Sequence, residues 1–311
     1  MSVNIMVIKL GALGDMVQAL GPMAAIRRYH DDVQITALTT KPYAAFLEAS
    51  GFFDEVWVDT RPSLLNIGAW MELRRRFRDG GIRRVYDLQT SDRSGWYFRL
   101  FGAPQPEWSG IAAGCSHPHT NPQRDAMHTI ERQREQLTVA GIDDVPGPDV
   151  GWAAADLSEF GLLNKYSLLV PGGARHRPAK RWPQANYVEL AERLCDDGQT
   201  PVLIGDADEG DLLGAIAAAV PGAVNLAGRT DLLQLAELGR RAVCAVGNDT
   251  GPMHLIAAAG CKAVVLYSHD SDPALCAQRG AEVSILRRPT LDRLKVTTVI
   301  AALDNSTSGV V

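Results

Sequence analysis

Short apolar runs alternate with amphipathic segments along the first half of the chain. Continuous apolar runs of this length are typical of strands buried in a parallel sheet, and apolar spacing of three or four residues indicates helices. The pattern predicts strands over residues 3–8, 34–40, 55–58 and 85–89, and helices over residues 16–30, 43–50, 74–78 and 128–140.

The second half repeats this alternation. It predicts strands over residues 166–170, 200–204, 242–246, 263–267 and 282–286, and a short strand with a loop over 224–230. Helices are predicted over 182–194, 208–219, 232–240 and 291–303. A glycine-containing loop follows the first strand of each half. We therefore predict an α/β protein with two Rossmann-like, doubly wound domains, residues 1–150 and 151–303, facing across a cleft. Residues 141–152 would link them, and 304–311 would form a disordered tail.

Composition narrows the class of protein. The 311 residues are 46% hydrophobic and 22% charged, with a formal net charge of −5. Neither half is basic, which argues against a nucleic-acid binder held by bulk charge. The five cysteines have no zinc-ligand spacing, and no stretch approaches the length of a membrane-spanning helix. These features predict a cytoplasmic protein with reduced thiols, and they leave peripheral contact with the inner membrane open.

The segment Asn248-Asp249-Thr250-Gly251-Pro252-Met253-His254 follows an apolar run and has the residues of a tight turn and a helix start. Thr250 or Asp249 can cap that helix, and its N-terminus is suited to an anion. Asp249 and His254 could then face one cleft. The alternative is a capped helix with a structural histidine.

A second loop, Lys9 to Asp15, follows the first predicted strand. Its glycines, Gly11 and Gly14, give G-x-x-G rather than the G-x-G-x-x-G of dinucleotide-binding proteins, and no acidic residue closes the second strand. An NAD site is therefore disfavoured. Either the loop presents Asp15 to a substrate, or Asp15 merely caps the following helix.

Two further segments are rich in basic residues. Pro171-Gly172-Gly173-Ala174 precedes Arg175, His176, Arg177, Lys180 and Arg181, which suits a diphosphate, although a solvated charged loop is the alternative. Arginines between 61 and 99 could meet an anionic acceptor or form solvated faces. Ser91 and Arg93, in the loop after the strand over 85–89, are the acceptor candidates. Residues 102–124 are predicted to be irregular, and His117 and His119 there have no spacing that favours a metal site.

Three segments resemble glycosyltransferase family 9, the heptosyltransferases of lipopolysaccharide core assembly. They are residues 248–254, the segment from Pro171-Gly172-Gly173 to Lys180-Arg181-Trp182-Pro183, and residues 224–230. The resemblance spans roughly residues 3–303. It implies the GT-B fold, with the donor on the C-terminal domain and the acceptor on the N-terminal one. Gln18, where many relatives have histidine, and Tyr267-Ser268, where many have Phe-Gly, depart from the family pattern.

The resemblance also implies roles for individual residues. Asp15, beside Gly14, would be the general base, and Lys180 would contact the donor diphosphate together with the Thr250 and Gly251 N–H groups. Gly172 and Gly228 would lie along the nucleotide, Asp249 would hold sugar hydroxyls, and His254 would steady the loop or the phosphates. Because lysine and a helix N-terminus serve the diphosphate, no metal or other cofactor is expected, and Asp206-Ala207-Asp208 is not expected to bind one.

The implied reaction is transfer with inversion from ADP-L-glycero-D-manno-heptose to a Kdo-containing lipid A core. Three alternatives stay open. The chain could be a family member that uses another nucleotide sugar or acceptor, or a nucleotide-sugar-binding protein without catalysis. The third, a Rossmann oxidoreductase, is disfavoured by the glycine spacing.

Overall fold

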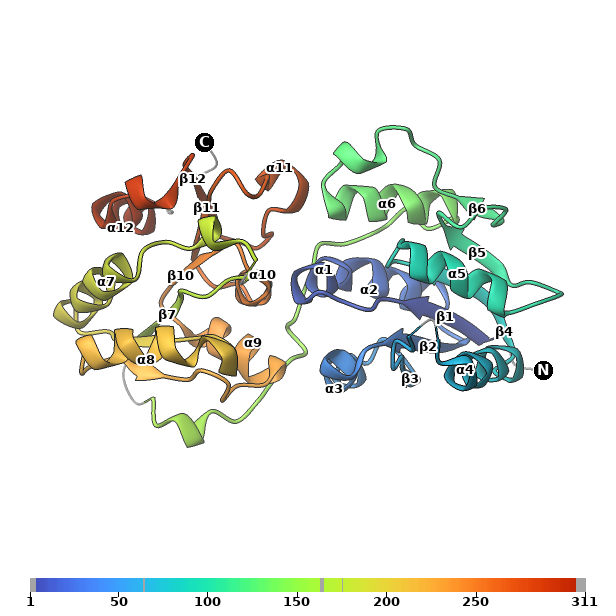
Figure 1. The fold of residues 1–311 in the computed structure, drawn as a ribbon, viewed down its shortest axis with the longest axis horizontal. Helices are drawn as coiled ribbons and strands as arrows, with labels where there is room; N and C mark the ends of the chain where they lie inside the picture. The colour runs from blue at the N-terminus through green and yellow to red at the C-terminus, as the bar shows by residue number, and fades with distance from the viewer. Residues whose placement is uncertain (1–3, 64, 163–164, 175, 306–311) are drawn as a thin grey trace. The chain divides into compact units, whose positions relative to one another are not determined.

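The computed structural model describes residues 4–63, 65–162, 165–174 and 176–305. Val3, Arg175 and the tail from 306 onward, all named above, lie outside the described residues. The chain divides into two compact units, Met1–Pro148 and Asp149–Val311 (Figure 1). Within the described residues, no helix combines the length and apolarity that crossing a bilayer would need. The five cysteines are all thiols.

Unit 1 contains one six-stranded sheet in the order β3-β2-β1-β4-β5-β6, with every neighbouring pair parallel. Its strands are β1 (Asn4–Ile8), β2 (Gln34–Thr39), β3 (Glu55–Val58), β4 (Ile82–Asp87), β5 (Glu107–Gly110) and β6 (His117–Pro118). Its helices are α1 (Leu13–Gln18), α2 (Leu20–Tyr29), α3 (Lys41–Ala49), α4 (Ile67–Asp79), α5 (Asp92–Leu100) and α6 (Thr129–Val139).

Unit 2 repeats the arrangement in the order β12-β11-β10-β7-β8-β9, again entirely parallel. Its strands are β7 (Tyr166–Val170), β8 (Thr200–Leu203), β9 (Val224–Asn225), β10 (Ala245–Asn248), β11 (Ala263–Tyr267) and β12 (Val283–Arg287). Its helices are α7 (Gln184–Asp196), α8 (Gly210–Ala219), α9 (Leu232–Arg241), α10 (Gly251–Ala258), α11 (Pro273–Cys276) and α12 (Val296–Asn305).

Each sheet grows outward in two directions from a central pair of strands. In unit 1 the chain runs from β1 to β2 and β3 on one side, then returns to β4, β5 and β6 on the other. Right-handed crossovers in opposite directions put helices on both faces of a sheet. Unit 2 does the same from β7 and β10. The predicted doubly wound α/β class is confirmed in both units.

Burial explains why the apolar runs are strands. Covered on both faces, β1, β7 and β11 are buried along nearly their whole length. The unit 1 core adds an aromatic group in which Phe77 stacks on Phe101 and Phe98 lies against Trp108. In unit 2 the core includes Trp182 and Tyr187, packed edge to face.

Several predicted boundaries are wrong. The helix expected over 16–30 is two helices, because Pro22 has no N–H to donate to the Gln18 carbonyl. Residues 102–124 are not wholly irregular, since β5 and β6 complete the sheet there. The strand expected over 242–246 is Ala245–Asn248 instead, because residues 242–244 form the connection from the end of α9. Asp304 and Asn305 belong to α12 rather than to a disordered tail.

The strand order also predicts where ligands bind. In sheets of this type, ligands bind at the carboxyl ends of the two strands between which the order reverses. In unit 1 these strands are β1 and β4, followed by the loops that lead to Asp15, in α1, and to Ser91. In unit 2 they are β7 and β10, followed by the Gly172 and Asp249 loops.

Candidate functional site

The two loops at the reversal point of unit 2 are joined through Asn248. This fully buried side chain donates from Nδ2 to the carbonyls of Pro171, at 2.8 Å, and Gly172, at 2.9 Å. Its Oδ1 accepts hydrogen bonds from the Trp182 N–H and the Tyr187 hydroxyl. Asn248 therefore fixes the glycine loop against the start of α10. Sequence reasoning gave it no role, because nothing local shows that its partners lie more than sixty residues away.

Asp249 and Lys180 form a nearly buried ion pair. The Lys180 Nζ lies 2.6 Å from Asp249 Oδ2, and the two side chains are 11% and 7% exposed. Ser271 Oγ donates to the same oxygen at 2.5 Å, and Gln278 Nε2 donates to Oδ1 at 3.0 Å. Burial alone would raise the pKa of Asp249, but the bonds from Lys180 and Ser271 and the charge of Lys180 hold that pKa below its ordinary value. Ser271 and Gln278 were missed from the sequence.

The start of α10 differs from the expected cap. Thr250 is the N-cap residue, yet no side-chain hydrogen bond caps the helix, so the prediction that Thr250 or Asp249 does so is wrong. Asp249 is instead held by Lys180, Ser271 and Gln278. The Thr250 hydroxyl is buried and has no hydrogen-bond partner among the described residues. Gly251 opens the helix, and His254 is buried in its first turn.

The glycine loop contacts a carboxylate that the sequence analysis did not single out. Glu209 accepts from the Gly173 N–H at 2.7 Å and from the Asp206 N–H at 3.1 Å. A Cβ on Gly172 would stand 1.9 Å from Glu209 Oε1, so a larger residue there would displace the Glu209 carboxylate from its present position. On the other side of the loop, a Cβ on Gly173 would lie 3.8 Å from the Thr250 methyl group. The loop thus lies between Glu209 and the start of α10.

Gly228 stands beside this group at the end of the sheet. Its φ is +66°, and a Cβ there would lie 3.0 Å from the Ala207 Cβ. Its N–H donates to the Gly205 carbonyl at 2.9 Å, which ties the loop after β9 to the one after β8. Glu209, at the end of that β8 loop, reaches Gly173, so Gly172, Lys180, Gly228, Asp249, Thr250 and Gly251 all belong to one edge of unit 2.

The loop after β1 is held by three neighbouring strand ends. The Leu10 carbonyl accepts from Arg61 Nη2 at 2.6 Å and from Thr40 Oγ1 at 3.2 Å, while the Leu10 N–H donates to Gln89 Oε1 at 2.8 Å. Gly14 and Asp15 follow as the second and third residues of α1. The Asp15 side chain is exposed. A fixed loop therefore presents an accessible carboxylate at the carboxyl edge of the sheet.

Two buried charged groups lie behind that loop. Lys9 is 4% exposed and donates from Nζ to the Leu88 carbonyl at 3.1 Å. Burial lowers its pKa, while the charges of Asp15 and Asp87 oppose that shift. Burial raises the pKa of Asp87 to about 6, against the hydrogen bonds that its carboxylate accepts from Thr90 and Gln89. Neither residue was singled out from the sequence, because their burial depends on the sheet.

Ser91 and Arg93 lie at the end of β4, as predicted, but both have structural partners. Ser91 caps α5 in a reciprocal capping box with Ser94. Arg93 donates to the Tyr97 hydroxyl and the Pro62 carbonyl, and its guanidinium lies 5.6 Å from the Trp70 ring centre. A surface hollow of about 340 Å³ opens beside Ser91, with Trp96, Arg99 and Ile111 among its lining residues.

The two loop histidines are not brought together. His117 contacts Ser116 and Arg84, whereas His119 contacts Glu135 and Arg124. Among the residues that the structure covers, no three His, Cys, Asp or Glu side chains form a group that could hold a metal ion.

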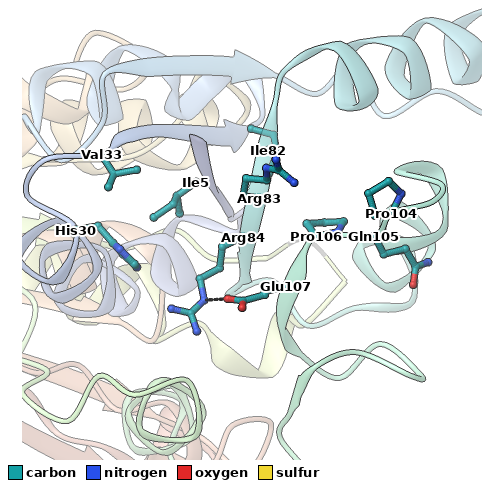
Figure 2. Close-up of a pocket in the computed structure, with 10 residues that line it drawn as sticks. All are labelled: Ile5, His30, Val33, Ile82, Arg83, Arg84, Pro104, Gln105, Pro106 and Glu107. Carbon is teal, nitrogen blue, oxygen red and sulfur yellow. Dashed lines mark ion pairs between the residues drawn. The ribbon is translucent and has the colours of Figure 1, made fainter. Parts of the chain in front are cut away.

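A larger hollow, of about 450 Å³, lies at the opposite edge of the unit 1 sheet. Figure 2 shows it at the amino ends of β1, β4 and β5, with the Arg84–Glu107 ion pair at 2.9 Å on its wall. His30 also lines this hollow, and its Nε2 lies 2.7 Å from the Tyr86 hydroxyl oxygen. Because Asp15 and Ser91 follow the carboxyl ends of the strands, this hollow is separate from the candidate site.

His30 is expected to make unit 1 sensitive to acid. Burial, followed by the charges of Arg84 and Arg27, lowers the pKa of His30 to about 4. Between about pH 6.5 and 4 the unfolded chain binds a proton that the folded chain does not, so the free energy of unfolding decreases as the pH is lowered. Because the His30 ring is only half buried, solvent screens part of this effect, and the expected loss of stability is about 1 to 2 kcal/mol. Urea unfolding at pH 7 and pH 4.5 should show this loss in the wild type and its reduction in His30→Gln. An equal loss in both proteins would contradict the assignment.

The chain is similar to known proteins of one family. The family model described as glycosyltransferase family 9 (heptosyltransferase) matches residues 70–290. Lipopolysaccharide heptosyltransferase 2 of Escherichia coli K12 is 40% identical over 229 residues, which are 67% of this chain and 66% of that relative. Lipooligosaccharide heptosyltransferase 2 of Haemophilus influenzae is 38% identical over 104 residues, 32% of this chain and 30% of the relative. The matched parts thus span about a third to two thirds of these two curated relatives.

Solved structures share the fold over almost the whole chain. The E. coli ADP-heptose lipopolysaccharide heptosyltransferase II superposes with a TM-score of 0.82 at 22% identity, covering 98% of each chain. A family 9 glycosyltransferase from Veillonella parvula gives 0.83 at 20% identity, covering 98% of this chain and 97% of the other. These likenesses confirm the GT-B fold class.

Proposed function

The chain belongs to glycosyltransferase family 9, the heptosyltransferase family, and we propose that it transfers heptose, with inversion, from ADP-L-glycero-D-manno-heptose to an anionic lipopolysaccharide core acceptor of the lipid A type. Unit 2 binds the nucleotide sugar and unit 1 the acceptor. The observation that carries the proposal is the edge of unit 2, where a glycine loop, a nearly buried lysine and a helix start meet at the reversal point of the sheet. The reaction belongs in the cytoplasm, at the inner face of the inner membrane.

The donor edge has the groups that a leaving diphosphate requires. Lys180 uses one hydrogen bond on Asp249, and an ammonium group can donate three, so the remaining N–H groups can reach a phosphate oxygen. The N–H groups at the start of α10 add a partial positive charge, and the Thr250 hydroxyl, which has no partner among the described residues, can donate as well. Charge that develops on the diphosphate during transfer would be stabilised by these groups.

Asp249 both positions Lys180 and contacts the sugar. Its oxygens accept from Lys180, Ser271 and Gln278, and an ionised carboxylate has about four lone-pair sites. One site therefore remains for a sugar hydroxyl. Gly172 and Gly228, where a Cβ would crowd Glu209 and Ala207, let the backbone approach the nucleotide closely. His254, buried one turn into α10, steadies this loop.

The acceptor edge supplies the base. Asp15 is exposed at the start of α1, just after a loop that Arg61, Thr40 and Gln89 hold at Leu10, so its carboxylate can take the proton of an acceptor hydroxyl. Gly14 precedes Asp15 in α1 and has no side chain that could stand between Asp15 and the acceptor. Arg93, with Ser91 beside it, offers a cation for the carboxylates or phosphates of the acceptor.

Selective binding of ADP is the direct test of the donor. Calorimetry on the purified protein should show ADP binding at least about tenfold tighter than UDP or GDP, equivalent to about 1.4 kcal/mol. Preference for UDP or GDP would keep the family and discard heptose as the sugar. Binding of none of the three would favour a family member that has lost its donor site.

A further inference from the structure

A cluster of large apolar side chains is exposed at the beginning of α4. Leu65, Ile67 and Met71 are 93%, 73% and 59% exposed, and they fall within seven residues of one another. The other large apolar residues that the structure leaves exposed are spread along the chain. Isolated exposed apolar residues need no explanation, but a local cluster of this kind marks an interaction surface.

Folding does not need this cluster. The residues by which α4 packs on the core are Trp70, Leu73 and Phe77, which meet the aromatic group of unit 1. At 100° per residue, Ile67 and Met71 lie roughly a quarter turn away from that packed face. Helix α4 therefore carries a second apolar face, near its N-terminus, that none of the described residues of unit 1 covers.

The same exposed face continues into positive charge. Arg74 and Arg78 follow Ile67 and Met71 at helical spacing, so the four side chains form one stripe along α4. Both arginines are exposed, and neither forms an ion pair with any residue that the structure describes. Arg75 and Arg76, by contrast, are engaged by Glu72 and the Trp57 ring. The stripe is apolar at one end and cationic at the other.

The apolar end of the stripe belongs to the edge of the sheet at which Asp15 lies. Helix α4 follows β3, so its N-terminus starts from the carboxyl edge of the parallel sheet. Trp70, between Ile67 and Met71 in sequence, donates to the Ser63 carbonyl and packs against Arg93. The exposed cluster and the proposed acceptor residues are thus connected through one side chain.

We propose that this stripe of Ile67, Met71, Arg74 and Arg78, with Leu65, docks unit 1 on an anionic lipid bilayer. The apolar side chains would enter the boundary between headgroups and acyl chains, while the arginines would contact lipid phosphates. An anionic bilayer fits better than a protein partner because the charge is of one sign and borders the apolar cluster. The inference adds a membrane partner to the proposed function and can fail while that function stands.

Vesicle binding by the full chain tests the surface. The wild type should co-sediment with phosphatidylcholine vesicles that contain phosphatidylglycerol, and less with phosphatidylcholine alone. Ile67→Ser/Met71→Ser should bind the anionic vesicles at least about tenfold more weakly. Arg74→Gln/Arg78→Gln should lose the preference for anionic lipid and the salt dependence. Val139→Ser, which changes an exposed apolar residue on α6 of the same unit, should bind as the wild type does.

Two readouts separate this surface from catalysis. The Ile67→Ser/Met71→Ser protein should keep its thermal midpoint and ADP affinity, and it should transfer sugar normally to a delipidated acceptor but more slowly to a vesicle-embedded one. Wild-type protein that ignores anionic vesicles, or a serine variant that binds them unchanged, overturns the proposal. Self-association of the wild type that the serine variant abolishes, without vesicle binding, would instead assign the face to a second copy of the chain.

Discussion

Replacing Asp15 by Asn is expected to lower kcat by about a thousandfold, within the range on the order of 10² to 10⁴ that a general base contributes. The substitution keeps the size of the side chain and removes its ability to take a proton. Asp15 is exposed, so the fold should lose little stability. ADP binding should be unchanged, because the proposed donor residues all belong to unit 2. Single-turnover transfer assays and ADP calorimetry on the same protein measure the two effects.

Asp92 provides the matched control. It is also an exposed aspartate in the first turn of a helix, α5, that starts at the carboxyl edge of the unit 1 sheet. Asp92→Asn should leave kcat within about twofold of the wild type, because Asp92 has no assigned part in proton transfer. Any effect of its position between Ser91 and Arg93 should appear in the KM for the acceptor. Equal losses in the two variants would mean that negative charge along the edge matters, and not proton transfer by Asp15. Full activity in Asp15→Asn would show that another group is the base.

Lys180→Met is expected to damage both stability and donor binding. It leaves the Asp249 carboxylate, 7% exposed, without its cation, and breaking a nearly buried ion pair in this way costs about 3 to 5 kcal/mol. It also removes the charged donor proposed for the diphosphate, a charge-assisted bond of about 1.5 to 3 kcal/mol, so ADP affinity should fall about ten- to a hundredfold. Urea unfolding and calorimetry below the unfolding transition separate the two effects.

The double variant Lys180→Met/Asp249→Asn tests the cause of each loss. With both charges gone, most of the lost stability should return, while ADP binding should stay weak. Lys262→Met controls for removal of a lysine charge from the same unit, because Lys262 precedes β11 at the opposite edge of the sheet, and ADP binding should not change. Recovery of ADP affinity in the double variant would show that Lys180 acts only as the counter-ion of Asp249.

The hydrophobic pattern predicted the architecture because strands that are buried on both faces are apolar along most of their length. The runs at 166–170 and 263–267 are strands with the predicted bounds, since each is buried throughout and is apolar apart from Ser167. The two strands within 102–124 escaped detection for the opposite reason. β5 and β6 are short and lie among Pro, Gly and His, and they exist because they pair with β4 and with each other.

For the candidate site, too, local motifs predicted one part and could not predict the other. Local motifs identified the loops at Asp15, Gly172 and Asp249, because a parallel strand followed by glycine and a helix start is a short-range pattern. The same motifs could not reveal that Glu209 accepts from the Gly173 N–H. They also misassigned the cap of α10, since the competing partners of Asp249 come from residues 180, 271 and 278.

By itself, then, the sequence determined the α/β alternation, the two repeats and the loops at which chemistry is concentrated. These follow from neighbours within a few residues, where hydrophobic spacing and turn propensity act. Only the tertiary structure decided which polar groups are buried and what satisfies them. Asn248 bridging two strand ends, Lys180 paired with Asp249, and Leu65, Ile67 and Met71 left exposed all depend on long-range packing. A buried polar group needs a hydrogen-bond partner, and the residues next to it in sequence do not show where in the fold that partner lies.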